Sequence, residues 1–149
     1  MLNAIMILTK KTPSGSCRNN MDKQSFWDSV SYYEYLTHAM NGPKDSIPDY
    51  YWEEAKEPFI EVCKKLKPDI IICMGYETYE HLPNYGEIHE SFKTRGRNET
   101  LEVWKYDKKI KAKEIKDPLY VCRIRHPSAP EFVNKNWFAL FRRFLESLE

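Results

Sequence analysis

Apolar residues recur at three- and four-residue spacing between residues 49 and 66, which is the period of one face of an α-helix. Pro48 and Asp49 provide a start for this helix. Lys67 and Pro68 provide an end, because basic residues suit a helix C-terminus and proline cannot continue the hydrogen-bond ladder. The pattern therefore predicts a helix over residues 49–66. Its apolar face comprises Trp52, Ala55, Phe59, Cys63 and Leu66.

A continuous apolar run follows over residues 70–74 and is bounded by Pro68 and Gly75. Such a run predicts a strand that is buried on both faces. A helix, a loop and a strand in this order make half of a parallel α/β unit. Gly75 permits a sharp turn, and residues 77–82 are predicted to form a short helix after it.

The second half of the chain alternates between strand and loop composition. Residues 83–100 carry one proline, two glycines and two asparagines and are interpreted as a loop, whereas residues 101–106 and 119–125 have strand composition. A strong apolar stripe then predicts a closing helix, opened by Asn134 or Asn136 as its cap. The stripe consists of Trp137, Leu140, Phe141, Phe144, Leu145 and Leu148.

The amino-terminal part is harder to assign from its pattern. Residues 3–8 are typical of either a short buried strand or an apolar tail, and residues 9–22 of a polar loop. The aromatic-rich residues 24–40 are compatible with a short helix that runs into a strand near residues 30–36. We expect one α/β domain over residues 1–149, with a mostly parallel central sheet between two layers of helices. Residues 1–25 are expected to be poorly ordered or rebuilt.

Composition places the chain among globular proteins, with 42% hydrophobic and 30% charged residues in 149. The net charge is +1, so the whole-molecule charge does not favour nucleic acid as a partner. Aromatic residues make up 14%, which suits an α/β core or a semi-polar contact surface. No apolar run approaches the length of a membrane span, and a cytoplasmic location is the default expectation.

The four cysteines stand at positions 17, 63, 73 and 122 and form no Cys-x-x-Cys pair. Three of them lie within apolar patterns, which favours buried free thiols in a reducing compartment. No two Cys or His residues share a ligand spacing, so neither a zinc site nor any other metal or cofactor is expected. His38 and His89 have no partner close in the sequence and are predicted to be exposed.

The strongest candidate chemistry follows the strand over residues 119–125. In open α/β sheets, ligands bind in the crevice beyond the carboxyl ends of the strands. His126 and Gly75 both stand at such ends. His126 can donate a hydrogen bond to an anion or a carbonyl there, Pro127 stiffens the loop, and Ser128 can contact a phosphate. The alternative is structural: His126 caps the strand and Ser128 starts a turn.

This succession of strand and Gly75, then strand and His126-Pro127-Ser128, then helix resembles the C-terminal half of the uracil-DNA glycosylase superfamily. The resemblance implies a three-layer α/β/α fold and a target base flipped out of the DNA stack. It implies that His126 stabilises the leaving uracil anion, that Ser128 contacts the DNA backbone and that Gly75 is a position of close approach. Cleavage of an N-glycosidic bond needs such donors aimed at the departing base.

The resemblance extends to the second core strand of that family, which ends in an asparagine that reads uracil. Glu34 stands at the corresponding position here, and an ionised carboxylate accepts hydrogen bonds but donates none. Glu34 therefore argues against uracil and is compatible with an amino-bearing base or with a simple surface role. The family's Gly-Gln-Asp-Pro-Tyr-like motif is missing upstream, which leaves Glu34 as the candidate for activating water.

The neighbouring aromatic and basic residues complete the candidate site. Tyr76, Tyr79 and His81 follow Gly75 and are candidates for stacking on a base, with packing in the core as the alternative. Tyr33 and Arg125 are further candidates for contacts with nucleic acid, beside Ser128, Gly75 and Tyr76.

Three functions follow from these residues. The first is a metal-free hydrolase of N-glycosidic bonds, with His126 and Glu34 as its catalytic residues. The second is a protein of the same fold that binds DNA or a nucleotide without catalysis. The third is a protein-interaction module, including a homo-oligomer formed through an exposed sheet edge.

Overall fold

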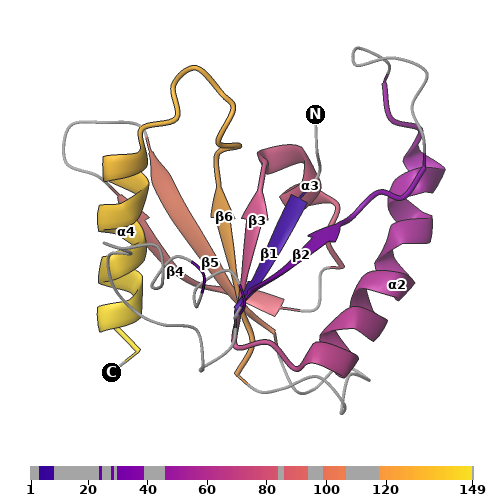
Figure 1. Cartoon of the computed structure of the whole chain (residues 1–149), viewed down its shortest axis with the longest axis horizontal. Coiled ribbons are helices and arrows are strands. Elements are labelled where there is room, and N and C mark those ends of the chain that lie inside the picture. Colours follow the sequence, from indigo (N-terminus) through magenta and orange to yellow (C-terminus); the bar gives the residue numbers. More distant parts are fainter. Residues whose placement is uncertain are drawn as a thin grey trace.

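The computed structural model describes residues 4–8, 24, 28, 30–38, 46–83, 86–93, 99–106 and 118–148 (Figure 1). Its strands are β1 (Ala4–Leu8), β2 (Val30–Glu34), β3 (Ile70–Met74), β4 (Gly86–Lys93), β5 (Thr100–Tyr106) and β6 (Tyr120–Ile124). Its helices are α2 (Asp49–Leu66), α3 (Tyr76–Glu80) and α4 (Asn134–Glu146).

The strands form one six-stranded sheet in the order β2-β1-β3-β6-β5-β4. Of its five strand pairs, only β3 with β6 is parallel. The prediction of a mostly parallel sheet is therefore wrong, and the sheet is mixed. Parallel pairing needs a long crossover connection, whereas β4, β5 and β6 follow one another as an antiparallel meander, and β1 lies antiparallel between β2 and β3.

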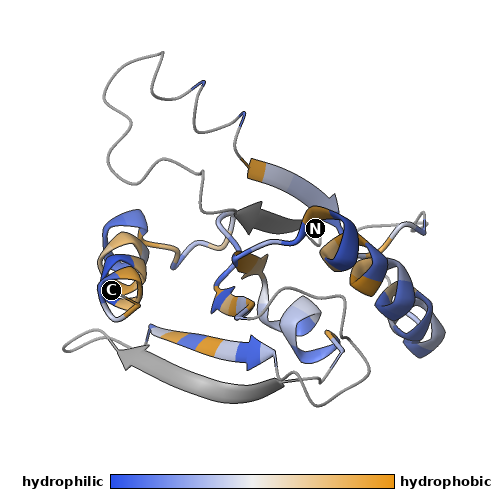
Figure 2. Ribbon diagram, turned by 90° about the horizontal axis from the view of Figure 1, so that it is seen from below, coloured by the Kyte–Doolittle hydropathy of each residue, from blue (hydrophilic) through white to orange (hydrophobic). Residues whose placement is uncertain are grey.

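The two long helices cover opposite faces of this sheet, as Figure 2 shows. Val121 and Cys122 are consecutive residues of β6, so their side chains point to opposite faces. Val121 belongs to the apolar cluster that contains Trp52 and Phe59 of α2. Cys122 belongs to the cluster that contains Leu140 and Phe144 of α4. The predicted α/β class is therefore confirmed.

Helix α2 begins and ends where its sequence pattern predicts. Pro48 precedes it in an extended conformation, without a side-chain cap. Lys67 ends it with a left-handed φ of 48°, and its N–H donates to the Cys63 carbonyl at 2.9 Å. The helix contains Pro58, which costs one backbone hydrogen bond because proline has no N–H. The predicted strands at 70–74, 101–106 and 119–125 are likewise confirmed as β3, β5 and β6.

Two predictions in the second half of the chain are wrong. Residues 86–93 form β4 instead of a loop, and β4 pairs with β5 along its length. A register shift between Ile88 and Glu90 interrupts the alternation of side chains by which a strand is recognised in a sequence. The residue at the N-cap of α4 is Val133 rather than an asparagine, and no side chain caps the helix. Asn136 instead donates from Nδ2 to Glu99 Oε1 at 3.0 Å.

The structure decides between some of the alternatives that the sequence left open for the amino-terminal part of the chain. Residues 4–8 form β1, which lies between β2 and β3 and is not an apolar tail. The predicted strand near residues 30–36 is β2. The predicted loop at 9–22, and most of the segment 1–25 that was expected to be poorly ordered or rebuilt, lie outside the described residues. Within the described ranges, no helix is long and apolar enough to cross a membrane; a cytoplasmic location stays a prediction.

Two phenylalanines of α4 differ in burial, so their substitution by alanine should affect stability to different extents. Phe144 is fully buried, whereas Phe138 on the same helix is 60% exposed. Phe144→Ala should lower the free energy of unfolding by about 3–5 kcal/mol, because it removes apolar contacts and leaves a cavity. Phe138→Ala should change it by no more than about 0.5 kcal/mol. Urea unfolding measures both, and equal losses would contradict the assignment of this helix face.

The buried thiols predict a loss of stability at alkaline pH. Burial raises the pKa of Cys63 from 9.0 to about 12 and raises the pKa values of Cys73 and Cys122 as well. Above about pH 9 the unfolded chain loses these protons while the folded protein keeps them, so stability falls as the pH rises. Each thiol contributes a slope of about 1.4 kcal/mol per pH unit in that window. Urea unfolding between about pH 8 and pH 11 measures the slope.

Cys63→Ala is the control for this effect. The variant lacks one of the buried thiols, so its slope should be smaller by about 1.4 kcal/mol per pH unit, whatever its stability at neutral pH. An unchanged slope would show that other groups cause the alkaline loss.

Candidate functional site

The candidate site lies where β3 and β6 end side by side. Met74 is in register with Ile124, and the next residue, Gly75, donates its N–H to the Ile124 carbonyl at 3.0 Å. From this point β3 leads into α3, whose Tyr79 packs in the α2-side core, whereas β6 leads through a loop to α4 on the other face (Figure 1). Two adjacent parallel strands whose connections leave to opposite faces define a topological switch point, where α/β sheets bind ligands.

Basic and aromatic side chains gather at this switch point. The guanidinium of Arg123 lies 4.5 Å from the ring centroid of Tyr76 and 5.3 Å from that of Tyr79. Arg125 lies 5.7 Å from the Tyr76 centroid. Arg123 and Arg125 are two residues apart around the end of β6, so they share a face, and this brings both beside Tyr76. Tyr76 and Arg125, two of the predicted contact residues, thus lie near each other, and Gly75 is the neighbour of Tyr76 in the chain.

Arg123 was not predicted as a site residue. The alternation of side chains along β6 places it on the same face as Arg125, and this pattern could have identified it. Arg123 forms an ion pair with Glu102 of β5 at 2.6 Å, and their side chains are only 18% and 27% exposed. A half-buried pair is more strongly held than one in open water, because water screens it less. Arg125 pairs with the more exposed Glu131 at 2.9 Å. Both arginines are thus oriented by a carboxylate on one side and by Tyr76 on the other.

Donors without a partner also gather here. Among the described residues, buried side-chain donors that lack a hydrogen-bond partner include the Tyr79 hydroxyl and the Nε atoms of Arg123 and Arg125. Burial raises the pKa of Tyr79, so its hydroxyl stays protonated and remains a donor. These three donors belong to the cluster of arginine and tyrosine side chains at the switch point.

The loop after β6 is a tight turn that holds the histidine. The Ala129 N–H donates to the His126 carbonyl at 2.9 Å, with Pro127 at the second position of the turn, where proline is favoured. The Ser128 N–H points at His126 Nδ1 at 3.2 Å, and the Ser128 hydroxyl lies 2.7 Å from the same nitrogen. A backbone N–H can only donate, so Nδ1 accepts and the imidazole hydrogen is on Nε2.

Ser128 has the structural role that was the alternative to a phosphate contact, and it also contacts His126. Its backbone belongs to the turn, which is the structural role, and its hydroxyl orients the His126 ring. Nε2 of His126 becomes a hydrogen-bond donor, which is what an anion or carbonyl acceptor requires. A contact between Ser128 and a phosphate stays a prediction.

Glu34 and Tyr33 stand apart from this cluster, on β2. Glu34 ends β2, which runs in the same direction as β3 and β6, so it lies at the same edge of the sheet. Three strand spacings of ~4.8 Å separate β2 from β6, which places the two strand ends roughly 14 Å apart. Glu34 and His126 are therefore too distant to touch, and a ligand would have to span this gap to contact both.

Tyr33 and His81 lie on the α2 side of the sheet. Tyr33 packs against Phe59 of α2, with 6.2 Å between ring centroids. His81 stacks on Trp52 at 4.2 Å and an interplanar angle of 16°. His38 is exposed, as predicted, but it has a partner in Glu54. Tyr79 is buried in the core, so its packing interpretation is confirmed.

No group of three or more His, Cys, Asp or Glu side chains that could hold a metal ion occurs in the described part of the chain. The described cysteines, Cys63, Cys73 and Cys122, are buried free thiols as predicted, and Cys17 lies outside the described residues.

Comparison with known proteins adds no relative: no family model, no curated protein and no solved structure matches the chain. The resemblance to the uracil-DNA glycosylase superfamily therefore stays a prediction that rests on the residues quoted for it. The geometry of the switch point has to carry any functional proposal.

The backbone conformation of Gly75 predicts that its substitution destabilises the protein. Its φ of 118° suits glycine alone, yet no atom lies within 4 Å of where a Cβ would stand. Gly75→Ala and Gly75→Ser should therefore destabilise the protein equally, by about 1–3 kcal/mol of backbone strain. Urea unfolding measures the two losses. A much larger loss for serine would indicate crowding, and no loss for either would show that the turn adopts another conformation.

Proposed function

We propose that this protein binds a nucleic-acid base or nucleotide at the switch point between β3 and β6, within a three-layer fold of the uracil-DNA glycosylase type. The observation that supports the proposal most is the gathering of Gly75, Tyr76, Arg123 and Arg125 where two parallel strands end and their connections diverge. Ligands of open α/β sheets bind at such points.

The chemistry of these side chains suits a nucleotide. Arginine recognises phosphate with paired N–H donors, and tyrosine and arginine planes stack on bases. The unpaired donors of Arg123, Arg125 and Tyr79 call for acceptor oxygens, which phosphate and base carbonyls supply. A ligand has room to approach Gly75, because no atom beyond its chain neighbours lies within 4 Å of where a Cβ would stand.

The tautomer of His126 favours a second candidate function, the hydrolysis of an N-glycosidic bond. With the ring hydrogen on Nε2, His126 can donate to the carbonyl of a departing base and stabilise the negative charge that develops there. Glu34 would act from the other end of the crevice by activating water or by accepting from an amino group of the base. A ligand that contacts both residues would have to span the gap between β2 and β6.

The binding proposal predicts a salt-dependent affinity for single-stranded DNA. Fluorescence anisotropy with a short labelled oligonucleotide should show that affinity falls as salt rises, because phosphate contacts release counterions. Arg125→Gln should weaken binding and reduce the slope of log affinity against log salt by roughly 0.7, the share of one phosphate contact on a single strand.

Arg142→Gln is the matched control, because Arg142 is an exposed arginine of α4 that pairs with Glu146. It should leave the slope unchanged. Binding that is absent or independent of salt, or an equal loss in both variants, would count against a nucleic-acid site at the switch point.

The hydrolase candidate predicts an activity that depends on His126. Oligonucleotides carrying uracil and other altered bases, incubated with the protein and then cleaved at abasic sites by alkali, would reveal base release. His126→Ala should slow release by roughly 100-fold or more, as expected for a donor aimed at a developing anion. Ser147→Ala at the end of α4 is the control. Equal release by wild type and His126→Ala, or release by neither, would reject hydrolysis while leaving binding open to the preceding test.

A further inference from the structure

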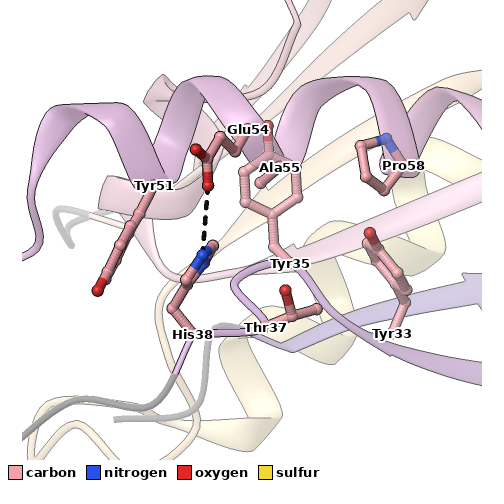
Figure 3. Close-up of a pocket in the computed structure, with 8 residues that line it drawn as sticks. All are labelled: Tyr33, Tyr35, Thr37, His38, Tyr51, Glu54, Ala55 and Pro58. Carbon is pink, nitrogen blue, oxygen red and sulfur yellow. Dashed lines mark ion pairs between the residues drawn. The ribbon is translucent and has the colours of Figure 1, made fainter.

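A pocket lies on the α2 side of the molecule, away from the switch point. It is a pocket of about 30 Å³ between helix α2 and the segment that continues β2 (Figure 3). The segment contributes Tyr33, Tyr35, Thr37 and His38. The helix contributes Tyr51, Glu54, Ala55 and Pro58.

The walls of this pocket are aromatic and firmly held. His38 stacks on Tyr51 with 4.0 Å between ring centroids and an interplanar angle of 10°. Tyr35 is fully buried, packs edge-on against Phe59 at 5.6 Å and donates its hydroxyl to the His81 carbonyl at 3.0 Å. Packing therefore fixes Tyr35, and stacking orients His38 and Tyr51 against each other.

The charge of the lining is negative or neutral. Glu54 is its carboxylate, and Oε2 of Glu54 lies 3.2 Å from His38 Nε2. A carboxylate has lone pairs for several donors, so this contact leaves Glu54 able to accept from a ligand. The eight lining residues include no lysine and no arginine. A phosphate or carboxylate ligand is therefore disfavoured, and a cation is favoured, since aromatic faces also attract cations.

Helix α2 adds a second acceptor through Pro58. Within an α-helix, the carbonyl of a residue accepts from the N–H four positions later. The residue four positions after Glu54 is Pro58, which has no N–H, so the backbone carbonyl of Glu54 loses its helical donor. Glu54 and Pro58 both line the pocket, and we infer that this carbonyl faces it. Glu54 thus offers two kinds of acceptor to one ligand, its carboxylate and its backbone oxygen.

We propose that this pocket binds a primary alkylammonium group. Such a group carries a positive charge for Glu54, several N–H donors for the carboxylate and the carbonyl, and an apolar stem for the tyrosine rings. The volume suits a head group of this size rather than a nucleobase. The group is that of a free amine or of a lysine side chain of a polypeptide, and the two sources share this chemistry.

The test is an NMR titration of the whole chain with n-butylammonium chloride, following the backbone amides of Thr37, His38, Tyr51 and Glu54. Saturable shifts of these amides are expected. Neutral n-butanol, which has the same stem, and tetramethylammonium, which has charge but no N–H donor, should each bind at least about tenfold more weakly, because charge-assisted hydrogen bonds are the strong ones. Equal binding of either compound, or no saturable shift, would overturn the proposal.

Three variants sharpen the result. Glu54→Gln removes the charge and should weaken binding about tenfold, whereas Glu57→Gln, an exposed carboxylate of the same helix outside the lining, should leave it within about twofold. Pro58→Ala restores an N–H for the Glu54 carbonyl, so it should raise the melting temperature while weakening the binding of n-butylammonium. A simple loss of structure would move these two readouts together. Unchanged binding in Glu54→Gln would overturn the proposal.

A last arm distinguishes the sources of the ammonium group. Nα-acetyl-lysine-methylamide carries the same group on a peptide-like backbone. Tighter binding of this compound than of n-butylammonium supports the site with a polypeptide as the source. Tighter binding of n-butylammonium supports it with a free amine.

Discussion

The parallel pairing of β3 with β6 is the constraint on which the rest of the structure depends. Both strands are buried, and consecutive residues of β6, Val121 and Cys122, belong to the two different cores. This pair therefore holds the α2 side and the α4 side together through one layer of backbone. It also aligns Met74 with Ile124, so that both strands end at one place. A change of register here would separate the two cores and the candidate site at once.

The sequence pattern predicts those elements whose burial has a period. Helix α2 and strand β3 are predicted to the residue, because an apolar face and a doubly buried run leave strong traces between clear stop signals. Strand β4 and the direction of the strands escape such reasoning. The register shift between Ile88 and Glu90 interrupts the side-chain alternation of β4, and strand direction depends on the connections rather than on local composition. The prediction of a mostly parallel sheet failed for this reason.

The residues of the candidate site can be predicted from the sequence where the ends of the strands can be predicted. Gly75, Arg125 and His126 are found because each follows a recognisable strand, and those ends meet once β3 pairs with β6. Arg123 was missed because it lies inside a strand, where an arginine reads as a surface residue until its partner, Glu102 on β5, is known. The pocket beside α2 was missed for a similar reason. His38 and Glu54 are distant in sequence, and only the packing of β2 against α2 brings them together.

The two proposed sites differ in the charge of their side chains, and contacts of Tyr35 and His81 connect them. The switch point presents arginines and unpaired donors, whereas the pocket presents a carboxylate and a carbonyl released by proline. Tyr35 forms a wall of the pocket and donates to His81, which follows α3, and α3 begins with Tyr76 at the switch point. His81 in turn stacks on Trp52 of α2. Because buried aromatic contacts of this kind do not deform gradually, a ligand that shifts Tyr35 has to move His81 or break its hydrogen bond. Because the two proposed sites differ in charge, they would select different ligands, and the hydrogen bond from Tyr35 to His81 connects the elements that carry them.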